Sequence, residues 1–247
     1  NVVVTDNIIT YVGSDIPNET YDKIYDVNGN ILMPGFVNCH AHTPMTLLRG
    51  FKDDVNLQDW LFNYIFPAEA KLTPNDIYWG QMLGIAEYVR AGITCAEENY
   101  FFTDEMLNAD VKAGFRERIS FGPKVNDTKS PTKYLEESYK SLSQKCPDLI
   151  TLSIFIHSIY TINEQSILDT LTFARKHNIP VGIHLSETLT EVGDCTTKNK
   201  DQTPPQYLET LGFFDRPNAL CAHCVHMDKD DLQILADYDA SIATNPS

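Results

Sequence analysis

The chain has 247 residues, of which 43% are hydrophobic and 21% charged, so it can bury a sizeable core in one large domain or two small ones. Lys and Arg total 19 against 34 Asp and Glu, and the net charge of −15 disfavours nucleic-acid binding because a phosphate backbone would be repelled. No apolar run approaches the roughly 20 residues of a membrane span. We expect a cytoplasmic protein with no visible signal peptide and with its six cysteines reduced.

The chain opens with a hairpin-like pattern, in which residues 2–4 and 8–12 are rich in β-branched residues and Asp6 and Asn7 form the turn. From a buried strand predicted over residues 31–38 onward, β-branched runs alternate with stretches of helical period, the pattern of parallel βα units. Further strands are predicted over residues 93–98, 119–125, 149–156, 181–185, 219–225 and 240–243. Helices are predicted over residues 74–91, 132–145, 163–177, 204–211 and 229–238, and a linker over residues 195–203.

Seven strands separated by helices predict an α/β fold of the (β/α)8 TIM-barrel type, whose active sites lie at the C-terminal ends of the strands. The sequence stops at Ser247, where the seventh strand should end. We therefore expect a barrel that is truncated before strand 8, with open edges on its first and seventh strands.

Histidines follow several of the predicted strands. His40 and His42 come after the first strand, and residues two apart in extended chain face the same side, so both imidazoles can hold one metal ion. His157, His184 and His223 lie at the ends of three later strands. Imidazoles brought to one rim by four strand ends are typical of a metal site, although a structural role remains the alternative for each, above all for His157.

Glu187 lies three residues beyond His184. In a continuous strand the two side chains would lie on opposite faces, so the strand must end near Leu185 for the carboxylate to turn into the barrel mouth. A carboxylate beside a metal-activated water can take its proton and pass it to a leaving group. The alternative is a solvated loop glutamate.

Three segments carry a resemblance to a known family: M-P-G-F-V-N-C-H-A-H at residues 33–42, H-L-S-E-T at 184–188 and A-H-C-V-H at 222–226. They closely resemble the amidohydrolase superfamily, in particular the deaminase and chlorohydrolase branch that includes 5′-methylthioadenosine/S-adenosylhomocysteine deaminase. The resemblance covers essentially the whole chain. It implies a distorted (β/α)8 barrel with a small β-sandwich built from both chain ends. Residues 1–30 would then be the N-terminal share of the sandwich, and residues 31–247 a metal-dependent hydrolase barrel that is incomplete at its C-terminus.

By this resemblance, His40, His42 and His184 match metal ligands, Glu187 matches the proton shuttle, and His223 matches the residue that orients the attacking water. The resemblance implies one divalent metal ion, with zinc expected and iron or manganese as alternatives.

Trp60, Glu69 and His157 fall where the adenosine-type deaminases contact substrate. A core aromatic for Trp60 and an exposed helix-end charge for Glu69 remain alternatives. The sequence departs from the family at two points. First, Phe121 stands where adenosine-type deaminases carry an arginine, which leaves the substrate class open. Second, the family's remaining metal ligand, an aspartate at the end of strand 8, is not in this sequence.

The resemblance implies hydrolytic deamination of a heteroaromatic amine, such as an aminopurine or an adenosine-like ring, with release of ammonia. The expected partner is a small heterocyclic substrate, with no nucleic acid or membrane, and a homo-oligomer is left open. The alternatives are a chlorohydrolase or cyclic-amide hydrolase of the same superfamily, and a catalytically incomplete barrel fragment. We expect this chain alone to be inactive, because the strand-8 aspartate would help to hold the metal and orient the attacking water.

Overall fold

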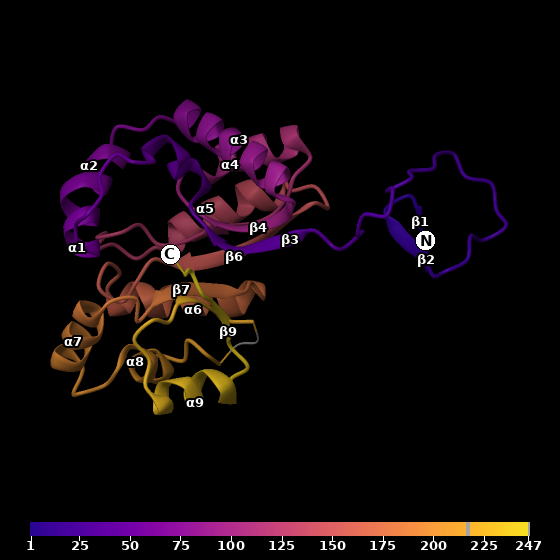
Figure 1. The fold of residues 1–247 in the computed structure, drawn as a ribbon. Coiled ribbons are helices and arrows are strands. Elements are labelled where there is room, and N and C mark those ends of the chain that lie inside the picture. The colour runs from indigo at the N-terminus through magenta and orange to yellow at the C-terminus, as the bar shows by residue number, and fades with distance from the viewer. Residues whose placement is uncertain (216–217, 247) are drawn as a thin grey trace. The chain divides into compact units, whose positions relative to one another are not determined.

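The computed structural model describes residues 1–215 and 218–246, so that Ser247, the last residue of the predicted barrel, lies outside the described residues. The chain divides into two compact units, Asn1–Pro34 and Gly35–Ser247. In the first unit, β1 (Val2–Thr5) and β2 (Ile8–Val12) pair antiparallel (Figure 1), which confirms the predicted hairpin. That this unit contributes to a β-sandwich stays a prediction.

The second unit contains one parallel sheet in which seven strands follow one another in chain order. The strands are β3 (Phe36–Ala41), β4 (Ile93–Asn99), β5 (Arg116–Phe121), β6 (Ile150–Ile156), β7 (Val181–Leu185), β8 (Leu220–His223) and β9 (Ser241–Ala243). Five strand spacings separate β3 from β8, which is about 24 Å in a flat sheet. The rings of His40 on β3 and His223 on β8 are nevertheless only 5.3 Å apart between centroids. The sheet therefore curls on itself, and the predicted α/β barrel type is confirmed.

Helices follow the strands along the chain and pack against the curled sheet (Figure 1). They are η1 (Thr43–Leu48), α1 (Leu57–Asp59), the π-helix η2 (Trp60–Ile65), α2 (Phe66–Glu69), α3 (Pro74–Ala91), α4 (Thr103–Ala113), α5 (Thr132–Ser143), α6 (Glu164–His177), α7 (Leu189–Lys198), α8 (Pro204–Thr210) and α9 (Lys229–Asp237). The core lies between sheet and helices and includes Ile119 of β5, Leu135 of α5 and Leu171 of α6. None of the helices described is both long and apolar enough to cross a membrane.

Several predicted strands have different bounds in the structure, and the first and the third differ most. The first begins at Phe36, not at residue 31, because Pro34 has no N–H to donate and the first bond to the neighbouring strand region runs from Phe36 N to Gly92 O at 2.9 Å. The third ends at Phe121, not at residue 125, because a glycine and a proline follow it.

Other differences lie in the second half of the chain and in helices that the sequence pattern did not predict. β8 ends at His223, because His223 and Cys224 have φ of 75° and 52° and leave the strand conformation. The predicted linker over residues 195–203 is wrong in its first part, which belongs to α7. Three further features were not predicted from the sequence: α4, the whole of α7, and the four short helical segments between residues 43 and 69.

Two glycines allow α3 to lie directly against η1. A β-carbon at Gly80 would lie 2.6 Å from the carbonyl oxygen of Pro44, and one at Gly84 would lie 2.2 Å from Cγ2 of Thr43. Neither position has room for a larger residue unless η1 moves. Because η1 begins one residue after His42, this packing fixes the backbone that carries His42.

Candidate active site

Three of the predicted histidines meet in the barrel mouth. His40 lies on β3, His42 follows that strand directly, and His184 lies on β7. The Nε2 atom of His184 is 3.1 Å from Nε2 of His40 and 3.3 Å from Nε2 of His42. Residues from the first and the fifth strand of the sheet are thus brought to one point, where they could hold a metal ion.

A bulge in β3 turns His40 inward. The pairing with β4 shifts register between Asn38 and Ala41, which sets three residues of β3 against two of β4. The side chain of Asn38 contacts Tyr88 of α3 at 3.3 Å, on the helix side of the sheet. His40, two residues later, nevertheless meets the other histidines inside the barrel.

Backbone carbonyl groups fix the orientation of two of the rings. Nδ1 of His42 lies 2.6 Å from the oxygen of Asn99, and Nδ1 of His184 lies 2.7 Å from the oxygen of His157. A carbonyl oxygen only accepts hydrogen bonds, so both Nδ1 atoms carry the hydrogen and both Nε2 atoms present a lone pair.

These lone pairs fit a divalent metal ion. Two lone pairs that face each other at 3.3 Å repel unless a cation lies between them. Imidazole ligands of tetrahedral zinc, at about 2.0–2.1 Å from the metal, are about 3.3 Å apart. The donor set and its spacing therefore match a zinc site.

Burial keeps the histidines of this site neutral. It lowers the pKa of His40 to about 2, and it also lowers the pKa values of His42 and His184, with neighbouring imidazoles adding to the effect at His40 and His184. The pKa values of His157 and His223 fall to about 4, again mainly through burial. Neutral imidazoles are the form that binds metals.

Glu187 and His223 face each other beside the three histidines. Oε1 of Glu187 lies 3.6 Å from Nε2 of His223. The side-chain amide nitrogen of Asn245 lies 3.2 Å from Nδ1 of His223 and can only donate to it, so the hydrogen of this ring is on Nε2. Burial raises the pKa of Glu187 to about 7, where the carboxyl group can both accept and release a proton near neutral pH.

A cavity of about 930 Å³ opens over this cluster. All eight side chains singled out from the sequence border it: His40, His42, Trp60, Glu69, His157, His184, Glu187 and His223. Trp60 begins η2 and donates its indole N–H to the carbonyl of Lys52 at 2.9 Å. Glu69 ends α2 and accepts the hydroxyl hydrogen of Tyr100 at 2.5 Å, so it is not an exposed helix-end charge.

Tyr100 and Lys124 also border the cavity and were not predicted from the sequence. Tyr100 directly follows β4, and its position at a strand end was the available signal. Phe121 faces away from the cavity, because its ring packs against Tyr139 and Phe173 in the core. Lys124 carries the only positive charge among the described residues that line the cavity, and its Nζ lies 5.0 Å from the ring centroid of Tyr134.

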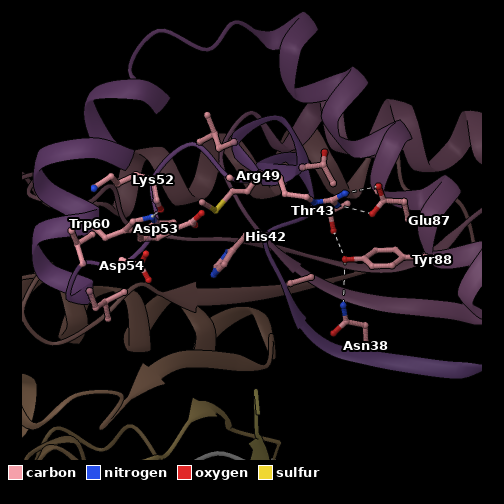
Figure 2. Close-up of a pocket in the computed structure, with 18 residues that line it drawn as sticks. Asn38, His42, Thr43, Arg49, Lys52, Asp53, Asp54, Trp60, Glu87 and Tyr88 are labelled. Atoms are coloured by element: carbon pink, nitrogen blue, oxygen red, sulfur yellow. Dashed lines mark hydrogen bonds and ion pairs between the residues drawn. The ribbon is translucent and has the colours of Figure 1, made fainter. Parts of the chain in front are cut away.

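A second hollow, of about 690 Å³, lies on the other side of His42 and Trp60, between η1, the segment that follows it and α3. Figure 2 shows its charged wall, where Arg49 pairs with Glu87 at 2.7 Å. Tyr88 there contacts the Thr43 hydroxyl at 2.7 Å. These contacts brace the backbone that follows His42.

An acidic cluster that was not predicted from the sequence lies buried outside both hollows. Gln81 donates its amide hydrogens to Asp110 at 3.0 Å and to Glu117 at 2.9 Å, and Glu98 accepts the backbone N–H of Thr43 at 2.9 Å. Within residues 1–215 and 218–246, no Lys or Arg forms an ion pair with these three carboxyl groups. Burial, reinforced by negative neighbours, raises the pKa of Glu98 to about 8, and burial raises that of Asp110 to about 6.

Comparison with known proteins gives one consistent result. Residues 31–247 match the sequence pattern of the amidohydrolase family. The chain is 37% identical over 251 residues to a 5-methylthioadenosine/S-adenosylhomocysteine deaminase from Desulforamulus reducens, covering 99% of the chain and 57% of that protein. It is 34% identical over 253 residues to a 5′-deoxyadenosine deaminase from Methanococcus maripaludis, covering 100% of the chain and 60% of that protein.

Among solved structures, an adenosine deaminase from Xanthomonas campestris with bound zinc superimposes with a TM-score of 0.79 at 32% identity, covering 87% of the chain and 49% of that structure. The chain therefore spans between 49% and 60% of the length of these three relatives.

Proposed function

The chain belongs to the amidohydrolase family, and from that premise we propose that its barrel carries the site of a metal-dependent hydrolase that removes the ring amino group of an adenosine-type substrate as ammonia. One observation carries the proposal. The Nε2 atom of His184 lies 3.3 Å from Nε2 of His42 and 3.1 Å from Nε2 of His40, so that three imidazole nitrogens converge on one point. Beside them lies the carboxyl group of Glu187, whose pKa is raised to about 7. Such a site suits the activation of water.

His40, His42 and His184 would hold the metal ion, for which zinc is the expected choice. Once bound, a divalent ion of this kind lowers the pKa of a coordinated water from 15.7 to about 7. Glu187 takes the proton of the attacking water while the oxygen bonds to the ring carbon that bears the amino group. The same carboxyl group passes this proton to the ring nitrogen. It then takes the second proton from the hydroxyl on the tetrahedral carbon and gives it to the departing amino group, so that the carbonyl forms, the carbon–nitrogen bond breaks and ammonia leaves.

His223 orients the attacking oxygen in this scheme. Its Nδ1 accepts from Asn245, so its Nε2–H is free to donate toward the space next to Glu187. With its pKa lowered to about 4, the ring is neutral at physiological pH and does not compete with Glu187 for the proton.

The remaining cavity residues would bind the heterocycle and its sugar. The indole N–H of Trp60 is already bonded to Lys52, so the face of the ring is what remains for packing against a base. Tyr100 holds one oxygen of Glu69, which leaves the other to accept a hydroxyl hydrogen of the substrate. A cavity of about 930 Å³ is large enough for a nucleoside.

A substrate panel tests this proposal on the purified full-length protein. We expect ammonia from 5′-deoxyadenosine or adenosine, and Glu187→Gln should lower the rate by on the order of 10²-fold or more without loss of folding. Chloride release from a chlorotriazine, or opening of a cyclic amide without ammonia, would replace the deaminase assignment by one of the related hydrolases. Full activity in Glu187→Gln would refute the role of this carboxyl group.

A further inference from the structure

The turn after β7 has to redirect the chain so that Glu187 points into the cavity. His184 and Glu187 are three residues apart, and strand geometry would place them on opposite faces. The chain leaves the strand at Ser186, whose φ of 49° lies in the left-handed region that non-glycine residues rarely adopt. Ser186 is also fully buried, so something must hold this conformation.

The side chain of Glu191 spans this turn. Oε1 accepts the backbone N–H of Ser186 at 3.1 Å, and Oε2 accepts the backbone N–H of Glu187 at 2.9 Å. One carboxylate thus binds two successive amides, the second of which belongs to Glu187 itself. Glu191 lies in the first turn of α7, where its own N–H is capped by the hydroxyl of Thr188 at 3.1 Å.

The burial of Glu191 needs an explanation, because it is only 2% exposed. Burying a carboxylate is costly unless hydrogen bonds satisfy it. No Lys or Arg pairs with it in the described part of the chain, and the donors that it meets are backbone amides of the turn. Thr188 is the N-cap of α7 and Glu191 stands at the third helical position, from which a glutamate can also help to cap the helix. Its two oxygens, however, accept the amides of Ser186 and Glu187, which precede the N-cap, so helix capping alone does not account for this side chain.

We propose that Glu191 is a positioning residue for Glu187: its two oxygens hold the turn at Ser186 in the conformation that directs the Glu187 carboxyl group toward the three histidines. The role in turnover rests on the proposed function, in which Glu187 moves the proton. The proposal that Glu191 holds the turn does not depend on that function, so its effect on the turn and its effect on turnover can be tested separately.

The first test measures amide hydrogen exchange across residues 185–188 in the full-length protein. Glu191→Gln keeps the length of the side chain but offers a single acceptor oxygen, so at least one of the two amides loses its partner. We expect exchange there to become about tenfold faster or more. Asp194→Asn makes the same carboxyl-to-amide change on an exposed position of the same helix and should leave exchange unchanged. Unchanged exchange in Glu191→Gln would overturn the proposal.

The second test uses ammonia release from 5′-deoxyadenosine. We expect Glu191→Gln to lower kcat about tenfold or more while KM changes by less than about twofold, because binding groups elsewhere in the cavity are untouched. In a Glu187→Gln background the same change should have almost no further effect, since Glu191 acts through Glu187.

An equal loss in both backgrounds would overturn the proposal. So would a Glu191→Gln protein that loses bound zinc or its fold together with activity, because Glu191 would then stabilise the barrel as a whole. If the unmodified protein releases no ammonia, the proposed function fails, and hydrogen exchange still decides whether Glu191 holds the turn.

Discussion

The contact between α3 and η1 leads to a prediction about Gly80. A β-carbon there would lie 2.6 Å from the oxygen and 3.0 Å from the Cα of Pro44, and neither backbone atom can rotate away. Alanine gains about 1 kcal/mol in helix propensity over glycine, whereas overpacking of this kind costs about 1–3 kcal/mol. With both contacts at 3.0 Å or below, we expect the upper part of that range and a net loss of about 1–2 kcal/mol for Gly80→Ala.

Gly193→Ala is the matched control. Gly193 lies inside α7, is exposed, and would have no atom within 4 Å of an added β-carbon, so the same substitution should stabilise the protein by about 0.5–1 kcal/mol. Thermal unfolding followed by circular dichroism should show the two variants shifting in opposite directions, by about 2–4 °C per kcal/mol. Because η1 directly follows His42, its displacement in Gly80→Ala should also weaken zinc binding, whereas Gly193→Ala should bind zinc like the unmodified protein. A Gly80→Ala protein as stable as the unmodified one would refute the argument from close packing.

Two further predictions concern the metal site and the acidic cluster. His42→Ala should lose most of its bound zinc in elemental analysis, while His226→Ala, which removes an imidazole outside the trio, should keep it; equal zinc in the two would contradict the ligand assignment. The pKa of Glu98 is about 8 in the folded protein and 4.5 in an unperturbed carboxyl group, so the folded state binds this proton more tightly than the unfolded state. The stability that this difference contributes is fully present below about pH 4.5 and is lost as the pH rises through about 8. Denaturant unfolding at constant zinc should therefore show stability falling over this window more steeply in the unmodified protein than in Glu98→Gln, and identical slopes would argue against a proton on Glu98.

The sequence predicted best those features that depend on local rules. The helix α3 has the predicted bounds because Thr73 caps it, Pro74 begins it and Gly92 ends it with a φ of 80°. The histidines and Glu187 around the cavity were predicted because parallel strands bring their C-terminal ends to one rim, so position along the chain already indicates position in space. Trp60 and Glu69 lie on helical segments, and only the family resemblance indicated them.

Other features depend on tertiary contacts that no local pattern reports. Glu98 and Glu191 read as ordinary charged residues, and only the fold shows that both are buried. The helical segments between residues 43 and 69 include a 3-10 helix and a π-helix, which do not follow the 3.6-residue period used to recognise helices. The inward turn of His40 depends on a bulge that appears only when β3 pairs with β4.

The most direct test of the account is a zinc titration of the chelator-treated full-length protein, read by ammonia release from 5′-deoxyadenosine. If the three histidines hold the metal that activates water, the treated protein is inactive, and activity rises with added zinc until one ion is bound per chain. The His42→Ala protein should recover little activity over the same range. Steady ammonia release from the metal-free protein, or full recovery by His42→Ala, would contradict the central claim.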